Sequence, residues 1–245
     1  MRFIPDIRYD VLENSFLDLY LPDGECKDLL IWFHGGGLVS YSRKNILFAE
    51  DLTAQGIGIA SVEYRLYPQA KFPDFLMDAA QAVKFLLDNI KNYADPERIF
   101  ISGQSAGAYI TLMLAFDNTY FENAGVDRAA ISGYISDSAQ ITTHYSVLEE
   151  KGIPKILERI DEAAAIYHLS KESKVNNLLL IYYTDDIPCR PEQNLLFYKS
   201  IRKVCPEINV AIKELPGEHT NGSIRRNIQG TFDYCDALLD FINRI

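Results

Sequence analysis

The sequence lacks the features that mark membrane proteins and metal-binding proteins. None of its apolar runs approaches the roughly 20 residues that span a bilayer, and residues 1 to 6 contain no apolar stretch of signal-peptide length. The cysteines form no CxxC pair, which argues against a zinc site or a redox couple. They are Cys26, Cys189, Cys205 and Cys235. We expect a cytoplasmic protein with reduced thiols that binds neither a metal nor a membrane.

Basic residues are scarce relative to acidic ones. The chain has 24 Lys and Arg against 34 Asp and Glu, which gives a formal net charge of -10 and a pI near 4.9. Phosphate backbones and anionic lipid head groups are bound largely through clustered Lys and Arg. The charge balance therefore excludes nucleic acid as an expected partner.

The remaining composition is that of an ordinary globular protein. Of the 245 residues, 48% are hydrophobic and 24% are charged, so the chain can bury a substantial core. Single α/β domains commonly reach this length. We expect one domain over residues 1–245, and its composition leaves the oligomeric state open.

A series of short apolar segments predicts β-strands separated by helical patterns. Residues 16–21 alternate like a half-exposed strand, whereas residues 29–33 form a continuous apolar run that is typical of a buried strand. Further strands are expected at 57–62, 99–102, 131–135, 178–183 and 210–215. This alternation predicts an α/β protein with a doubly wound, mostly parallel sheet, an antiparallel start and helices on both faces.

Two helices are expected from apolar residues at helical spacing, one over Asp74 to Asn89 and one over Thr231 to Ile245. The segment from Ser138 to Ser170 departs from the rhythm because it is long for a connection, and it includes a candidate helix from about Pro154 to Ile166. Residues 138–170 are either a small lid insertion or an ordinary surface excursion.

A catalytic motif lies between an expected strand and an expected helix. Gly103-Gln104-Ser105-Ala106-Gly107 fits the pattern G-x-S-x-G, in which a sharp turn presents the serine hydroxyl at the carboxyl edge of the sheet. Small neighbours are needed there because the backbones of strand and helix approach closely. Taken alone, the motif is equally consistent with a turn that only links two elements.

A second motif, His34-Gly35-Gly36-Gly37, directly follows the buried strand that ends at Phe33. Consecutive glycines allow backbone N–H groups to converge on one point, as the developing oxyanion of acyl transfer requires.

With these motifs the sequence resembles the hormone-sensitive-lipase-like carboxylesterases of the α/β-hydrolase superfamily. Tyr64-Arg65-Leu66-Tyr67-Pro68 and Phe72-Pro73 look like that family's YRLxP and FP segments, and they lie in the expected order. The resemblance implies an α/β-hydrolase fold, an oxyanion hole formed by the N–H groups of Gly36, Gly37 and Ala106, and a structural role for His34. We expect Arg65 to pair with Asp74 or Asp78 rather than to bind substrate.

Ser105 needs a base, and in this fold the chain order is Ser, then Asp or Glu, then His. His144 and His168 precede the last expected strands, whereas His219 follows them in a loop that contains Gly217. His219 is therefore the expected base.

The acid should follow the strand at 178–183, where both Asp185 and Asp186 qualify. In similar hydrolases the acid stands seven residues before the Gln of a PxxPPEQ-like stretch. Because Pro191-Glu192-Gln193 matches the end of that stretch, the resemblance favours Asp186.

These residues predict a serine carboxylesterase that cleaves short-chain acyl esters of small molecules through an acyl-enzyme, with a Ser105, His219, Asp186 triad and no cofactor. The same groups would serve an amide or formamide hydrolase of the kynurenine-formamidase type, or a feruloyl or acetyl-xylan esterase. The alternative outside the enzymes is a catalytically silent binding protein on the same fold.

Overall fold

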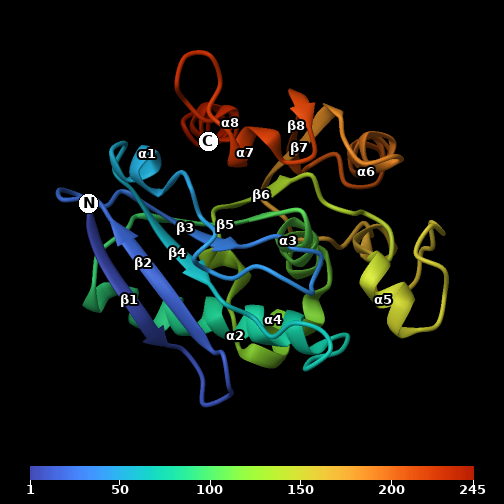
Figure 1. Ribbon diagram of the computed structural model, residues 1–245, viewed down its shortest axis with the longest axis horizontal. Coiled ribbons are helices and arrows are strands. Elements are labelled where there is room, and N and C mark those ends of the chain that lie inside the picture. Colours follow the sequence, from blue (N-terminus) through green and yellow to red (C-terminus); the bar gives the residue numbers. More distant parts are fainter.

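The computed structural model describes residues 1–245 and contains an eight-stranded sheet with the order β1-β2-β4-β3-β5-β6-β7-β8 (Figure 1). β1 and β2 pair antiparallel, as do β2 and β4, and all other neighbouring strands are parallel. The strands are β1 Arg2–Arg8, β2 Phe16–Leu21, β3 Asp28–Phe33, β4 Ile57–Val62, β5 Arg98–Gln104, β6 Gly133–Asp137, β7 Asn177–Asp185 and β8 Asn209–Glu218.

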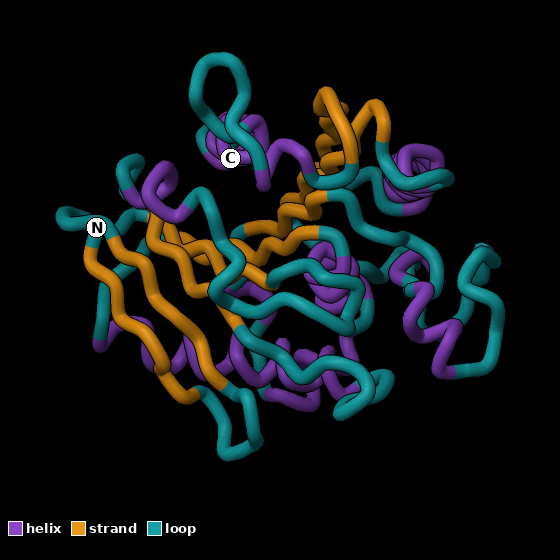
Figure 2. Tube along the Cα trace, viewed as in Figure 1, coloured by secondary structure: helices purple, strands orange, loops and turns teal.

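Helices cover both faces of this sheet (Figure 2). The longer α-helices are α2 Asp74–Asn89, α3 Ala106–Phe116, α6 Arg190–Val204 and α8 Asp233–Ile242. The short α-helices are α1 Ala49–Thr53, α4 Asn118–Ala124, α5 Tyr145–Glu150 and α7 Asn221–Ile224, and the 3₁₀ helices are η1 Ile90–Asn92, η2 Arg128–Ala130 and η3 Ala165–His168.

The core consists of two layers, one on each face of the sheet. The larger cluster has 47 buried residues and includes the apolar sides of α2 and α3. The smaller one has 21 and includes those of α1 and α8. β3 and β4 are buried along their whole length, because helices cover both of their faces. The α/β fold with its antiparallel start and mostly parallel interior, which the sequence predicted, is confirmed.

One strand has no counterpart among the sequence predictions. β1 lies at the edge of the sheet, most of its residues are exposed, and it contains Pro5. Its pairing with β2 shifts register between Ile4 and Ile7, and Asp6 between them has a φ of 57°. An exposed, bulged edge strand carries little of the apolar pattern by which strands are recognised.

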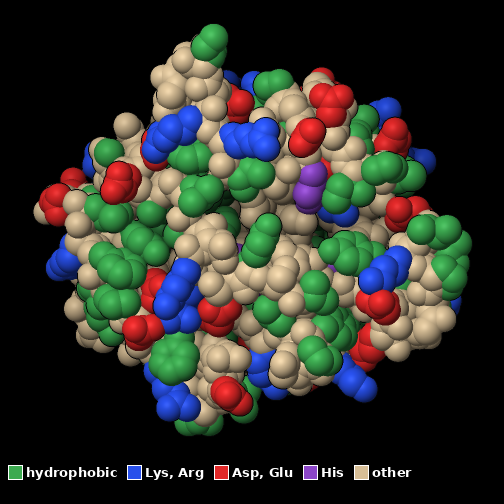
Figure 3. Space-filling view, in the orientation of Figure 1, with side chains coloured by type: hydrophobic (Ala, Val, Ile, Leu, Met, Phe, Trp, Pro, Cys, Tyr) green, Lys and Arg blue, Asp and Glu red, His purple; other side chains and the backbone are tan.

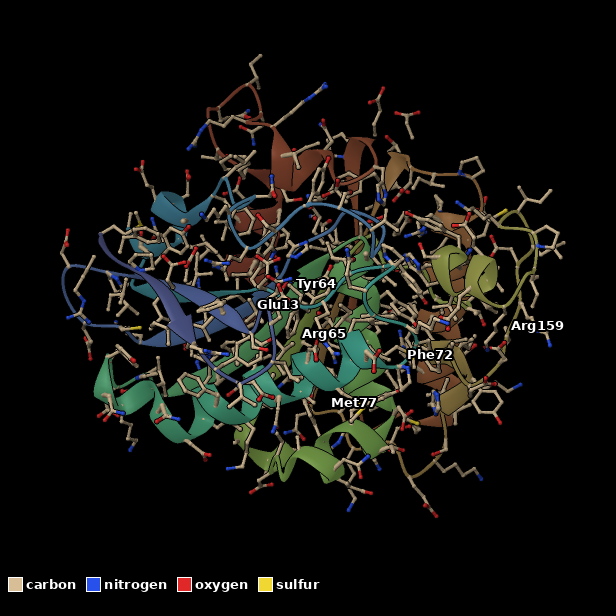
Figure 4. All side chains as sticks on the ribbon, turned by 60° about the horizontal axis from the view of Figure 1, so that its bottom comes forward. Glu13, Tyr64, Arg65, Phe72, Met77 and Arg159 are labelled. Atoms are coloured by element: carbon tan, nitrogen blue, oxygen red, sulfur yellow. The ribbon has the colours of Figure 1, made fainter.

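The helix expected from Pro154 to Ile166 is wrong. In the segment 138–170, helical structure occurs only at α5 and at η3, and residues 154–164 are turns and coil. Their large apolar side chains have no partner face, since Ile156 is 90% exposed and Ile160 is 53% exposed. A short helix draws most of its stability from packing an apolar face, which this stretch does not do. Arg159, at the rim of the molecule in Figure 4, marks the outer course of this loop.

No helix of the structure combines the length and the apolar character that a membrane crossing requires. The cysteines Cys26, Cys189, Cys205 and Cys235 are all free thiols.

Candidate active site

Five loops with polar side chains meet at one edge of the sheet. β3, β5, β6, β7 and β8 are consecutive neighbours in the sheet and run parallel. Their carboxyl ends therefore lie side by side, as in other open α/β sheets where ligands bind at this edge. The residues that directly follow these strands are His34, Ser105, Ser138, Asp186 and His219.

Ser105 occupies a strained turn between β5 and α3. Its backbone has φ 53° and ψ -109°, a conformation that residues other than glycine rarely adopt. A Cβ on Gly103 would lie 2.2 Å from the carbonyl carbon of Gly107, and a Cβ on Gly107 would lie 2.0 Å from the Phe33 oxygen. Glycine is thus required at both positions, because the loop after β3, the end of β5 and the start of α3 leave no room for a side chain.

Ser105, His219 and Asp186 form a continuous chain of hydrogen bonds. The Oγ of Ser105 lies 2.8 Å from Nε2 of His219, and Nδ1 of His219 lies 2.6 Å from Oδ1 of Asp186. The side chain of Asp186 is fully buried, whereas that of His219 is 23% exposed. This arrangement can move a proton from the serine hydroxyl to an imidazole whose other nitrogen faces a carboxylate.

Asp186 and Asp185, which the sequence left as alternatives, differ completely in their surroundings. Asp185 is exposed, and its carboxylate accepts a hydrogen bond only from the neighbouring Thr184 hydroxyl, at 3.0 Å. Burial acts to raise the pKa of Asp186, but hydrogen bonds from His219 and Ser138 outweigh it, so the pKa is lowered. The structure therefore brings Asp186, and not Asp185, to the histidine.

The glycine loop after β3 lies beside the serine with free donors. The backbone N–H groups of Gly36 and Gly37 donate to no protein acceptor, and Ala106 begins α3, where an N–H has no partner within the helix. Both glycines have positive φ, 97° and 65°. A Cβ on Gly37 would lie 1.9 Å from the hydroxyl oxygen of Tyr145 in α5, so α5 packs directly against this loop.

His34 fixes the start of the glycine loop. Its buried imidazole stacks on the Tyr64 ring with centroids 4.3 Å apart, and the Tyr64 hydroxyl donates to the His34 carbonyl at 2.7 Å. Arg65 is next in the chain, beside Tyr64 in Figure 4. It donates from Nε and Nη2 to Asp78 at 2.8 and 2.7 Å, while its closest approach to Asp74 is 3.9 Å. The expected pairing of Arg65 with an acid of α2 is confirmed.

The other histidines are used elsewhere. His144 is fully buried and caps α5, since its Nδ1 accepts from the Ser146 N–H at 3.2 Å. Burial lowers its pKa well below the ordinary range. His168 contacts the Glu162 carbonyl at 2.8 Å. No cluster of three or more His, Cys, Asp or Glu side chains is arranged to hold a metal ion.

Two residues of the site belong to no motif and were not predicted. The Ser138 hydroxyl lies within hydrogen-bond distance of both Asp186 and His219. Asp137 is fully buried and accepts from the hydroxyls of Tyr183 and Ser223 at 2.7 and 2.5 Å. Both residues make these contacts because β6 is paired with its neighbours in the sheet. In the sequence, only their position at the end of a predicted strand distinguishes them.

Comparison with known proteins finds a matching family model and esterases of similar sequence. The family model described as BD-FAE matches residues 17–184. A probable isoprenylcysteine alpha-carbonyl methylesterase of Arabidopsis thaliana is 36% identical over 114 residues, which are 44% of this chain and 27% of that protein. Neutral cholesterol ester hydrolase 1 of Rattus norvegicus is 35% identical over 114 residues, 42% of this chain and 27% of that protein. The matches thus span about a quarter of the length of these relatives.

Solved structures show the same fold over nearly the whole chain. A truncated carbohydrate esterase from gut microbiota superposes with a TM-score of 0.79 at 17% identity, covering 100% of this chain and 96% of that one. Esterase B of Lactobacillus rhamnosis superposes with a TM-score of 0.76 at 17% identity, covering 99% and 84%. The α/β-hydrolase fold expected from the sequence is confirmed.

Proposed function

Because the chain belongs to the BD-FAE family, we propose that it is a serine carboxylesterase that cleaves short-chain acyl esters through a covalent acyl-enzyme. The observation that carries the proposal is the hydrogen-bonded series from Ser105 through His219 to Asp186 beside a glycine loop with free N–H donors. Residues 1–245 act as one catalytic domain.

In the first step the Ser105 oxygen attacks the ester carbonyl carbon while its proton passes to Nε2 of His219. The 2.8 Å separation of these atoms is the distance at which such a transfer operates. Asp186 fixes the imidazole with its proton on Nδ1, so that Nε2 is the basic nitrogen, and its negative charge stabilises the imidazolium.

The carbonyl oxygen gains charge as the carbon becomes tetrahedral. The N–H groups of Gly36, Gly37 and Ala106 supply the hydrogen bonds for that oxygen, and each such donor is worth about two to three orders of magnitude in rate. Because Ala106 is the first residue of α3, the positive end of the helix also faces the developing anion.

The tetrahedral intermediate then collapses. The alcohol leaves with the proton from Nε2 of His219, and Ser105 keeps the acyl group as an ester. A water molecule gives a proton to the same nitrogen and attacks the acyl carbon, which releases the carboxylic acid and restores Ser105. No organic cofactor or metal is required by these steps.

The surroundings of the site favour a small, apolar acyl group. Val39 and Tyr41 follow the glycine loop and are 53% and 61% exposed, and Ile187 follows Asp186. Apolar side chains lie between acidic and basic groups across the face drawn in Figure 3. The segment 138–170 places only the six-residue α5 against the glycine loop, which is little cover for a long acyl chain.

A fluorophosphonate probe tests the nucleophile. We expect labelling of the wild-type protein and none of Ser105→Ala. His219→Ala should lose at least about 100-fold in labelling rate because the base is missing, whereas His168→Ala, which changes a histidine outside the site, should label normally. A wild-type protein that stays unlabelled would contradict the proposal and favour a silent binding protein.

A substrate series tests the acyl preference. With p-nitrophenyl esters, kcat/KM should be highest for acetate and butyrate and should fall for longer chains, because the short α5 gives little cover for a long chain. A kcat/KM that keeps rising for acyl chains longer than about C10 would contradict the short-chain assignment. Feruloyl esters and formylkynurenine, with Ser105→Ala as the blank, separate ester from formamide hydrolysis.

A further inference from the structure

Ser138 has its hydroxyl between the acid and the histidine of the candidate triad. Its Oγ lies 2.6 Å from Oδ2 of Asp186 and 2.9 Å from Nδ1 of His219. The residue is completely buried, so water does not compete for these contacts. Asp186 thus meets His219 with one carboxylate oxygen and Ser138 with the other.

The backbone of Ser138 is held in an unusual conformation that gives the hydroxyl this position. Its φ is 59°, in the left-handed region that serine rarely adopts. Its N–H donates to the Ile181 carbonyl of β7 at 2.9 Å, and its own carbonyl accepts from the buried Arg190 guanidinium at 2.6 Å. Such strain persists only where the surroundings over-determine it, and here bonds from two elements fix the residue.

The chemistry of the three groups assigns the protons. An ionised carboxylate only accepts hydrogen bonds, so the single Ser138 proton points to Asp186. A lone pair of the Ser138 oxygen then remains for the His219 Nδ1–H, which is shared between Asp186 Oδ1 and Ser138 Oγ. Both contacts favour the tautomer with the proton on Nδ1, which leaves Nε2 free to accept the proton of Ser105.

We propose that Ser138 is a positioning residue of the catalytic site, whose hydroxyl locks the Asp186 carboxylate and the His219 imidazole into the geometry and tautomer that activate Ser105. This inference rests on the proposed function. Ser138 does not touch the reacting atoms and acts through Asp186 and His219. Removing a hydrogen bond to a charged group should slow the serine's reaction by about 10- to 100-fold.

The test measures the rate constant for fluorophosphonate labelling across pH 5 to 9 in the 245-residue chain. Ser138→Ala should label about 10- to 100-fold more slowly than wild type. Its acid limb should also shift, because Ser138 contacts both the carboxylate and the imidazole that control the proton of Ser105. Ser136→Ala is the matched control, because it removes a buried hydroxyl two residues earlier, in β6, that has no hydrogen-bond partner.

Ser138→Gly separates the hydroxyl from the backbone strain. Glycine adopts a φ of 59° freely, so this variant should fold even if Ser138→Ala does not. It should lose as much labelling rate as the alanine variant. Recovery of the wild-type rate and acid limb in Ser138→Gly would show that the strained backbone, and not the hydroxyl, matters and would overturn the proposal.

Proton NMR gives a second readout that a purely structural role would not move. The Nδ1 proton of His219, shared between two acceptors, should resonate far downfield and should shift in Ser138→Ala and Ser138→Gly but not in Ser136→Ala. If Ser138→Gly still reacts with the probe, and its rate, acid limb and Nδ1 resonance match the wild type, the role of Ser138 is refuted while the esterase assignment stands. An unlabelled wild-type protein would instead refute the serine esterase assignment on which it rests.

Discussion

The buried carboxylate of Asp137 accepts a 2.5 Å hydrogen bond from the hydroxyl of Ser223, which lies in α7 just beyond His219. The Ser223 hydroxyl also accepts from the Gln104 amide at 2.8 Å, and the Asp137 carbonyl accepts from the Ser105 N–H at 2.8 Å. Asp137 therefore connects the turn that carries Ser105 with the loop that carries His219. Burial, which outweighs these hydroxyl donors, raises the pKa of Asp137 to about 7.

Asp137→Asn should gain stability relative to wild type as pH rises. The folded protein binds the Asp137 proton more tightly than the unfolded chain, whose pKa is about 3.9. The stabilisation from this group is thus complete below pH 4 and is lost as pH rises through about 7. The asparagine does not ionise and loses no stability in this way. As pH rises from 5 to 8, the free energy of unfolding of Asp137→Asn should therefore increase relative to wild type by on the order of 2–3 kcal/mol.

Urea unfolding of both proteins at pH 5 and pH 8 measures this difference. The asparagine can be accommodated because Ser223 retains a second acceptor, the Thr220 carbonyl at 3.0 Å. Asp185→Asn is the control, since that carboxylate is exposed at the neighbouring strand end. A difference between Asp137→Asn and wild type that stays constant with pH would show that Asp137 does not titrate in this range.

The sheet could be predicted wherever its strands are buried on both sides. Residues 57–62 and 29–33 form continuous apolar runs because helices cover both faces of β4 and β3, and the predicted bounds agree with the structure within one residue. The sequence did not predict β1, because this strand is exposed and bulged. Nor did it predict α5, because a six-residue helix capped by His144 has too few turns to show a helical period.

The candidate site could be predicted where chemistry depends on residue type and chain order. The motif predicts Ser105, the place after the last strand predicts His219, and the family resemblance favours Asp186 over Asp185. The structure brings His219 within hydrogen-bond distance of both Ser105 and Asp186. Ser138 and Asp137 belong to no motif, and only their position at a strand end marks them. Their contacts arise from a left-handed backbone angle and from the packing of β6 beside β7, neither of which leaves a pattern in the sequence.

Gly37→Ala should abolish most of the labelling and esterase activity through a collision with α5. The new Cβ would lie 1.9 Å from the Tyr145 hydroxyl oxygen, so either the glycine loop or the helix must move. We expect a loss of at least about 100-fold, the size associated with one displaced oxyanion donor.

Tyr145→Phe tests whether that collision is the cause. Without the hydroxyl, the nearest ring carbon lies 3.0 Å from the Cβ of Gly37→Ala, a contact that a small shift of the ring relieves. The double variant Gly37→Ala/Tyr145→Phe should therefore react about 10-fold faster than Gly37→Ala. It should stay below the wild-type rate, because alanine at a φ of 65° is still strained. Additive losses in the two variants would mean that α5 and the glycine loop act independently.

The segment 138–170 should behave as a fixed wall of the site rather than as a mobile lid. Its α5 is tied to the core by the Ser146 hydroxyl, which donates to the Gly37 carbonyl at 2.6 Å, and by Glu150, which accepts from the Tyr67 hydroxyl at 2.5 Å and the Phe72 N–H at 3.0 Å. Opening would break all of these bonds together. Hydrogen exchange of residues 145–150 should accordingly be slow in the wild-type protein, and covalent labelling of Ser105 should change it little.

Glu150→Gln supplies the contrast, because it keeps the shape of the side chain but removes the charge that strengthens the bonds to Tyr67 and Phe72. Exchange in α5 should speed up by about 10-fold, as expected from the loss of about 1.4 kcal/mol of local stability. Glu149→Gln, one residue earlier and paired only with the exposed Lys155, should leave it unchanged. Fast exchange of α5 in the unlabelled wild-type protein that slows after labelling would instead identify residues 138–170 as a lid that closes over the acyl group.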